Sequence, residues 1–449
     1  MLPTSFLQSL QGIKGFEETS FVSVHQSADK ITSIRLNPFK NRWQGDINHP
    51  VPWCDLGFYL TERPSFTFDP FFHAGAYYVQ EASSMFLWEI FKQTNGNNTE
   101  GLKILDLCAA PGGKSTLIAS YFTNSLIVCN EIIKARANIL EENITKWGNS
   151  NVVVTNNNPK SFSLLVNFFD IIVVDAPCSG SGLFRKDPNA INEWSENNVD
   201  LCSDRQEKII ADIIVALKED GLLIYSTCSY SKKEDEEILD KIIEQHDLES
   251  VSILLNKEWN IVESTSDKKR AWGYRFYPNL LKGEGFFVSV LKKKSGGFIG
   301  YFQEQRLLIP TKNEIQTINR HINLNNNFEY FKQGESIKIF PLAFYTDLQI
   351  LAKYLYIKKA GIELGVVKGS NLIPHHELAL SHLEIPSFNK LDLDKETALK
   401  YLKRSDLMIE NAVLGWTLLT YCGLCLGWSK VLPNRMNNYY PTSWRILKD

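Results

Sequence analysis

The sequence predicts an α/β fold whose centre is a doubly wound, mostly parallel sheet. Between about residues 102 and 291, apolar strand-like runs alternate with helical patterns, which is typical of this fold class. Several of these runs are almost continuously apolar, as expected for strands that are buried on both faces of a parallel sheet. The six predicted strands span residues 102–108, 126–131, 151–155, 169–177, 221–228 and 285–293.

A helix is predicted before the fifth strand. Ser203 and Gln206 have the spacing of a capping box, and Gly221 is expected to stop the helix. The apolar residues between them recur at helical spacing and predict one buried face. These residues are Ile209, Ile210, Ile213, Ile214 and Leu217.

The length of 449 residues is too great for one compact core and predicts two or three domains. The Ser-Gly-Gly stretch at 295–297 has the composition of a linker. We therefore predict a small α+β domain over residues 1–65, a central domain over 66–294 and a C-terminal domain over 298–449. In the N-terminal domain, TSIRLNPFK predicts a strand that carries the basic side chains of Arg35 and Lys40, with a solvated edge strand as the alternative.

The composition is that of a folded globular protein. With a net charge of -3 the chain does not attract nucleic acid by its overall charge, although local basic groups at 268–270 and 292–294 leave such a partner possible. The N-terminus lacks the features of a signal peptide, so a cytoplasmic protein is expected. The eight cysteines are then expected to be reduced thiols.

Residues 412–428 carry no charge and resemble a membrane span in composition. Three glycines interrupt this segment, so two buried strands around a turn are predicted and no membrane partner is expected. Cys422 and Cys425 form a CxxC pair with no second pair in the chain. We expect these cysteines to pack rather than to bind zinc, and we expect no metal site.

The first chemical motif is DLCAAPGGKS, from Asp106 to Ser115, between a predicted strand and a helix. Its small residues allow close approach of a ligand, and the start of the helix offers free N–H donors. A phosphate-binding Walker motif would need glycine where Cys108 stands, so a nucleoside triphosphatase is disfavoured. Glu131 ends the next strand, where a carboxylate can accept both ribose hydroxyls of a nucleoside cofactor.

Two further motifs end neighbouring predicted strands. DAPCSGSG runs from Asp175 and contains Cys178, and YSTCSY contains Cys228. The carboxyl ends of parallel strands form the ligand-binding edge in this fold class. Buried inert cysteines are the ordinary alternative, but two thiols at successive strand ends favour a functional pair.

Together, DLCAAPGGKS, DAPCSGSG and YSTCSY resemble the Nol/Nop/Sun family of RNA cytosine-5 methyltransferases. VPWCDLGFYL, YYVQEASSM and RFYPNLLKGEGFFVSVLKK resemble further stretches of that family, and GWTLLTYCGLCLGWSKVLPNRMNNYYP resembles the PUA-like RNA-binding domain of its bacterial small-subunit rRNA branch. The resemblance implies a Rossmann-like class I methyltransferase sheet with an antiparallel last strand. It also implies an N-terminal RNA-recognition domain.

The resemblance implies S-adenosylmethionine as cofactor and RNA as substrate. The expected RNA is ribosomal RNA, either free or in the small ribosomal subunit. Carbon 5 of cytosine is a poor nucleophile until a thiolate adds to carbon 6. The family implies Cys228 as that thiolate, Cys178 as the group that helps release the product, Asp175 as a partner of the cytosine edge and Lys114 as a residue that orients Asp175. The implied cofactor residues are Cys108, Ala109, Ala110, Pro111, Gly112, Gly113, Lys114, Glu131, Arg136, Asn158 and Asp175.

The chain departs from the family pattern at four positions. Family members commonly have aspartate where Asn158 stands and histidine where Asn279 stands, and they have glycine at Ser429 and lysine near Asn437. The alternatives are a tRNA cytosine-5 methyltransferase, a catalytically silent RNA-binding assembly factor, and a methyltransferase that acts on a small molecule or protein. The intact cysteine pair argues against the last two, and we expect a monomer.

Overall fold

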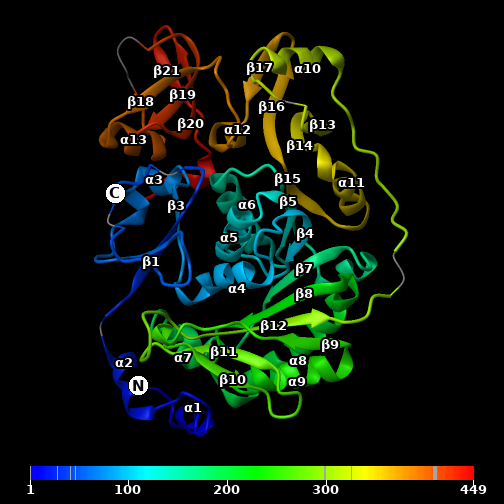
Figure 1. Ribbon diagram of the computed structural model, residues 1–449. Coiled ribbons are helices and arrows are strands. Elements are labelled where there is room, and N and C mark those ends of the chain that lie inside the picture. Colours follow the sequence, from blue (N-terminus) through cyan, green and yellow to red (C-terminus); the bar gives the residue numbers. More distant parts are fainter. Residues whose placement is uncertain are drawn as a thin grey trace.

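The protein is described by a computed structural model that covers residues 2–27, 29–40, 42–45, 47–297, 300–324, 326–407 and 412–448. Its centre is a ten-stranded sheet in the order β10-β11-β12-β8-β7-β4-β5-β6-β15, with β9 beside β12 (Figure 1). The strands of this sheet are β4 (Glu100–Asp106), β5 (Asn124–Asn130), β6 (Val152–Thr155), β7 (Phe169–Asp175), β8 (Leu217–Thr227), β9 (Leu248–Val251), β10 (Val262–Thr265), β11 (Trp272–Phe276), β12 (Phe286–Lys293) and β15 (Ile357–Ala360).

The prediction of a mostly parallel, Rossmann-like sheet with an antiparallel last strand is confirmed. Strands β4 to β8 pair in parallel, and β12 pairs with β8 in the antiparallel sense. Each of the six predicted strands is present. Strands β9, β10, β11 and β15 were not predicted from the sequence, because they are short and lack the continuous apolar character of the central strands.

Helices cover both faces of the central sheet. Because side chains alternate along a strand, Ile104 faces one layer of helices and its neighbour Leu105 faces the other. One layer consists of α4 (Leu87–Thr94), α5 (Gly113–Tyr121) and α6 (Lys134–Trp147). The other layer consists of α8 (Glu196–Ile213), α9 (Glu236–Gln245) and α11 (Tyr345–Tyr354). Each fully buried apolar side chain in these layers contributes about 1.5–3 kcal/mol.

Helix α8 corrects the predicted helix boundaries. The helix begins at Glu196, where the Ser195 side chain accepts a hydrogen bond from the Asn198 backbone N–H at 3.1 Å. Ser203 and Gln206 therefore do not cap the helix but lie inside it. The Ser203 side chain donates to the Lys233 backbone oxygen after β8, and Gln206 donates to the Pro177 backbone oxygen after β7 and to Glu234. Gly221 does not stop the helix, because it lies within β8.

The N-terminal part of the chain forms a three-stranded sheet with β1 in the middle. Arg35 on β1 is fully buried and donates to Gln80 Oε1 at 2.8 Å and to Thr116 Oγ1 at 2.6 Å. Its guanidinium also lies 4.6 Å from the Trp147 ring. The predicted strand is present, but the alternative of a solvated edge strand is wrong. The elements here are α1 (Thr4–Ser9), α2 (Glu18–Gln26), β1 (Thr32–Leu36), β2 (Gly57–Leu60), α3 (Pro70–His73) and β3 (Tyr77–Val79).

Lys40 fastens this N-terminal part to the last turn of α6. Its buried Nζ donates to the backbone oxygens of Ala74 at 3.0 Å and Lys146 at 2.6 Å. Burial lowers the pKa of Lys40 to about 7. Lys40, like Arg35, thus forms contacts inside the protein.

The C-terminal part contains two four-stranded sheets and also contributes β15 to the central sheet, where Ala360 pairs with Val153 (Figure 1). The prediction of two strands within residues 412–428 is confirmed by β19 and β20. The elements are α10 (Lys312–Asn319), β13 (Phe328–Gln333), β14 (Ser336–Pro341), β16 (Ile362–Lys368), β17 (Asn371–Pro374), α12 (His376–Leu380), β18 (Asn389–Leu393), α13 (Lys395–Leu402), β19 (Gly415–Tyr421), β20 (Leu424–Leu432) and β21 (Arg435–Asn438).

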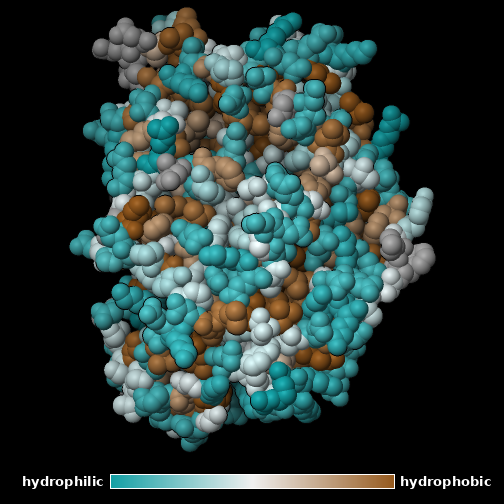
Figure 2. Space-filling view, in the orientation of Figure 1, coloured by the Kyte–Doolittle hydropathy of each residue, from teal (hydrophilic) through white to brown (hydrophobic). Residues whose placement is uncertain are grey.

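The surface agrees with this internal packing. Figure 2 shows one face covered mainly by hydrophilic side chains, with apolar side chains in separate groups. Within the described residues, no helix is long and apolar enough to cross a membrane.

Candidate active site

The first motif forms the turn between β4 and α5. Gly112 has a φ of +115°, and a Cβ atom there would lie 3.3 Å from Leu140 Cδ1, so glycine is favoured at this position. Before the turn, the Asp106 carboxylate is fully buried and accepts a hydrogen bond from Ser115 Oγ at 2.6 Å. Burial raises the pKa of Asp106 to about 7. The hydrogen bond between Asp106, before the turn, and Ser115, after it, thus stabilises the turn.

A cavity of about 570 Å³ opens at the carboxyl ends of the parallel strands. Its volume lies in the usual range for a small-molecule site. Among the residues that line it are seven that the sequence singled out: Cys108, Glu131, Arg136, Asn158, Asp175, Cys178 and Cys228. The other six are not among the lining residues and form the turn and the start of α5: Ala109, Ala110, Pro111, Gly112, Gly113 and Lys114.

Glu131 and Arg136 connect the second strand to the first motif. The buried Glu131 carboxylate accepts a hydrogen bond from the Ile133 backbone N–H at 2.9 Å and lies 3.3 Å from Arg136 Nη1. Arg136 also donates to the Ala110 backbone oxygen at 2.7 Å. Asn158 lines the same cavity and is exposed, and its Oδ1 accepts from the Lys160 N–H at 3.0 Å.

Asp175 is held by two partners at the end of β7. Its Oδ2 lies 2.9 Å from Lys114 Nζ, and its Oδ1 accepts from Ser226 Oγ at 2.9 Å. Burial acts to lower the pKa of Lys114, but the neighbouring Asp175 carboxylate outweighs this and the pKa is raised. Lys114 therefore remains charged and fixes the orientation of Asp175.

The two cysteines of the strand-end motifs are in contact. Cys178 Sγ and Cys228 Sγ lie 2.9 Å apart, on loops that follow the adjacent parallel strands β7 and β8. The hydrogen bond with Cys228, together with burial, raises the pKa of Cys178 well above its ordinary value. Cys178 therefore keeps its proton at neutral pH.

Glu234 belongs to the site but was not singled out from the sequence. Its carboxylate accepts hydrogen bonds from the Ser179 backbone N–H at 2.7 Å, from Ser179 Oγ at 2.6 Å and from Ser229 Oγ at 2.6 Å. The available signal was the acidic run that begins at Glu234, shortly after the cysteine of the fourth motif. Such runs are usually solvated, but here Glu234, Asp235 and Glu236 are buried and only Glu237 is exposed.

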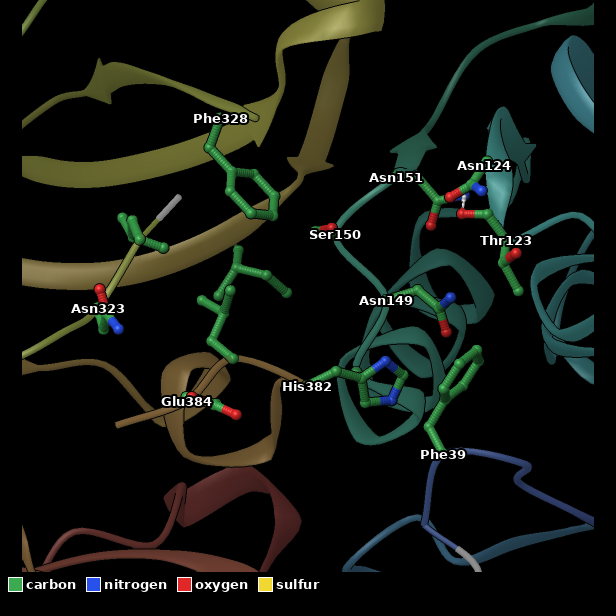
Figure 3. A pocket seen from close by; sticks show the side chains of 14 residues that line it. Phe39, Thr123, Asn124, Asn149, Ser150, Asn151, Asn323, Phe328, His382 and Glu384 are labelled. Atoms are coloured by element: carbon green, nitrogen blue, oxygen red, sulfur yellow. Dashed lines mark hydrogen bonds between the residues drawn. The ribbon is translucent and has the colours of Figure 1, made fainter. Parts of the chain in front are cut away.

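A second cavity, of about 630 Å³, lies at the amino ends of the parallel strands and contains none of the predicted site residues. In Figure 3, Phe39 and His382 lie beside each other below Asn149, with their ring centroids 4.6 Å apart. Asn124 and Asn151, which start or precede β5 and β6, line the same cavity. The predicted site residues that line a cavity thus lie at the carboxyl ends of the parallel strands, opposite this second cavity.

One group of side chains in the described residues has the spacing of metal ligands: Glu363, His375 and Glu377. Lys359 Nζ lies 2.5 Å from a Glu377 oxygen, and Lys338 Nζ lies 3.2 Å from a Glu363 oxygen. The two carboxylates are therefore already neutralised by lysines.

Comparison with known proteins decides the family. Three family models match the chain. The model for the 16S rRNA methyltransferase RsmB/F family matches residues 94–292, and the model for the N-terminal domain of 16S rRNA methyltransferase RsmF matches residues 2–82. The model for the methyltransferase RsmF PUA domain matches residues 388–446. Ribosomal RNA small subunit methyltransferase F of Psychromonas ingrahamii is 30% identical over 98% of this chain and 96% of its own length. The chain belongs to the RsmB/F methyltransferase family. The resemblance drawn from the motifs is confirmed.

Other relatives and solved structures agree with this membership of the RsmB/F family. Ribosomal RNA small subunit methyltransferase F of Aeromonas salmonicida is 31% identical over 89% of this chain and 85% of its own length. A methyltransferase homolog from Pyrococcus horikoshii superposes with a TM-score of 0.51 at 24% identity, covering 65% of this chain and 100% of that chain. NSun6 from the same organism, with SFG, gives 0.53 at 19% identity, covering 65% and 98%. At these identities the structures support the fold.

Proposed function

We propose that this protein transfers a methyl group from S-adenosylmethionine to carbon 5 of a cytosine in 16S ribosomal RNA. The observation that carries the proposal is the contact between Cys178 and Cys228 inside the cavity that also holds Glu131 and Asp175. A cofactor-binding fold alone does not require two thiols in contact. The substrate class is supported by the names of the RsmB/F relatives and by the match to a PUA domain.

The cavity fits the proposed cofactor. The buried Glu131 carboxylate faces a space of suitable volume, where it can accept the two ribose hydroxyls. Cys108, just before the turn, lines the cavity, and the turn leaves the first N–H groups of α5 free of helix partners. When bound, S-adenosylmethionine supplies the methyl group. Asn158, which also lines the cavity, is the residue that would hydrogen-bond the adenine.

The protein side of the reaction begins with Cys228. Its thiolate adds to carbon 6 of the cytosine, so that a sulfur–carbon bond forms and electron density moves to carbon 5. Asp175, oriented by Lys114 and Ser226, is placed to accept a hydrogen bond from the amino group of the cytosine and so to hold the ring against Cys228.

Release requires removal of the proton from carbon 5 and cleavage of the sulfur–carbon bond. While Cys228 is free, its hydrogen bond keeps the proton on Cys178. Once Cys228 has become a thioether, the largest cause of the raised pKa of Cys178 is removed, while burial and the Glu234 charge still act to raise it. Cys178 passes its proton to solvent and then acts as the base. Cys178 then takes the proton of carbon 5 and Cys228 leaves as a thiolate.

The test uses cysteine variants with 16S ribosomal RNA, assembled small subunits and tRNA as substrates. Cys228→Ala is expected to abolish methylation without any protein–RNA adduct. Cys178→Ala is expected to accumulate an adduct that survives denaturing electrophoresis, and the double variant is expected to show none. Cys202→Ala, which removes a buried cysteine of α8, is the control and should behave as wild type. Free product from Cys178→Ala at the wild-type rate would contradict the assignment.

A further inference from the structure

Glu234 lies between the loops that carry the two cysteines. We propose that Glu234 is a positioning residue whose carboxylate clamps these loops together and so keeps Cys178 and Cys228 in contact. The proposal rests on the proposed function for its catalytic meaning, but the clamp itself can be measured without RNA.

The clamp consists of hydrogen bonds to the residue that follows each cysteine. Ser179, next to Cys178, donates its backbone N–H to Glu234 at 2.7 Å and its Oγ at 2.6 Å. Ser229, next to Cys228, donates its Oγ to the same carboxylate oxygen at 2.6 Å. One carboxylate therefore bridges two loops that are 50 residues apart in the sequence.

Glu234 is itself held in place from two further elements. Gln206 on α8 donates to a Glu234 oxygen at 3.4 Å and to the Pro177 backbone oxygen at 3.1 Å, directly before Cys178. The Tyr225 hydroxyl on β8 donates to the Glu234 backbone oxygen at 2.6 Å. The carboxylate thus has a fixed position relative to both loops that carry the cysteines.

The cost of this arrangement points to function. Glu234 is fully buried, and burial raises its pKa. The neighbouring acids Asp235 and Glu236 pair with Arg275, whereas Glu234 has no ion-pair partner among the described residues. A buried carboxylate that is balanced only by neutral donors is costly to fold compared with an apolar side chain. Its negative charge also adds to the causes that keep Cys178 protonated.

The clamp is tested by the rate at which Cys178 and Cys228 form a disulfide. Diamide, a small thiol oxidant, takes up the two hydrogens and the two electrons as the Cys178–Cys228 disulfide forms, and peptide mapping by mass spectrometry follows this pair among the other cysteines. Glu234→Ala is expected to slow this reaction at least about 10-fold, because the loops lose their common anchor. With RNA, kcat is expected to fall about 100-fold, since misplacement by about 1 Å costs on that order. The KM for S-adenosylmethionine should stay unchanged.

Two further variants separate geometry from folding. Glu234→Gln keeps an oxygen for the Ser179 N–H and offers an NH₂ group to the serine oxygens, so it should restore the diamide rate and most of kcat. Ser229→Ala removes one link and should slow the diamide reaction partially; this readout remains if Glu234→Ala fails to fold. Glu237→Ala, an exposed neighbour on α9, is the matched control and should match wild type.

The two hypotheses fail differently. Diamide rates for Glu234→Ala and Ser229→Ala equal to wild type would overturn the clamp, whatever the activity. A diamide rate that depends on Glu234, in a protein whose Cys178→Ala variant forms no RNA adduct, would support the clamp and refute the proposed function.

Discussion

Lys40 makes the stability of the protein depend on pH in a way that can be calculated. Its pKa is about 7 in the folded protein because the amine is buried, and its ordinary value is 10.5. Between pH 7 and pH 9 the unfolded chain therefore holds a proton on Lys40 that the folded protein lacks. Stability rises with pH wherever the unfolded state binds more protons, at about 1.36 kcal/mol per pH unit for one group. Because Lys40 of the folded protein is still half protonated at pH 7, it should raise the free energy of unfolding by about 2.3 kcal/mol over these two units.

The measurement compares wild type with Lys40→Met by urea unfolding at pH 7, 8 and 9. Met has a similar length and no titratable group, and subtraction removes the contributions of all other groups. Loss of the bonds to Ala74 and Lys146 lowers the stability of the variant at every pH. The difference between the two proteins should nevertheless grow toward pH 9. Two stability curves that run parallel across this range would refute the inference that Lys40 is neutral when buried.

Two further predictions follow from the proposed function. Glu131→Ala should weaken S-adenosylmethionine binding by at least about 10-fold in calorimetry, because hydrogen bonds to a charged acceptor are worth about 1.5–3 kcal/mol. Asn158→Asp should bind S-adenosylmethionine equally well or slightly better. Unchanged affinity of Glu131→Ala would contradict the assignment of Glu131 to the ribose hydroxyls. Trp416, whose ring lies 4.5 Å from that of Tyr439 and 5.5 Å from Lys430 Nζ, should stack on an RNA base, so Trp416→Ala should lower RNA affinity by about 1–3 kcal/mol without changing cofactor affinity. Equal RNA binding by that variant would contradict a role of the C-terminal sheet.

The position of the cysteine pair could be foreseen because it follows from topology. Asp175 pairs with Ser226 in the parallel register of β7 and β8, so residues that follow these two strands must emerge side by side. The continuous apolar runs identified the strands, and the motif spacing placed Cys178 and Cys228 just beyond them. Local sequence was sufficient here because strand ends and short loops leave little freedom.

Other features depend on contacts between distant segments and gave no local signal. Arg35 is buried only because Gln80, Thr116 and the Trp147 ring converge on it from three other parts of the chain. The α8 cap was misplaced because Ser203 and Gln206 match a capping box locally, while Ser195 provides the cap in the folded protein. A pattern of residues shows what a side chain can do, and the fold selects among those uses.

The distribution of positive charge shows how an acidic chain can present a surface to RNA. The guanidinium groups of Arg35 and Arg275 are buried, where they bind neutral side chains, a backbone oxygen or the Glu236 carboxylate. Lys40, whose pKa is lowered by burial, donates to backbone oxygens. Arg35 and Lys40 hold the N-terminal sheet against α5 and α6, and Arg275 holds the loop after Cys228 against β11. Because these three side chains are buried, they are not accessible to phosphates. At the cavity itself, Arg205 and Lys208 on α8 are exposed and line the same space as Cys178. On the proposed function, the local charge at the mouth of the cavity, rather than the net charge of -3, determines how the RNA backbone approaches the two thiols.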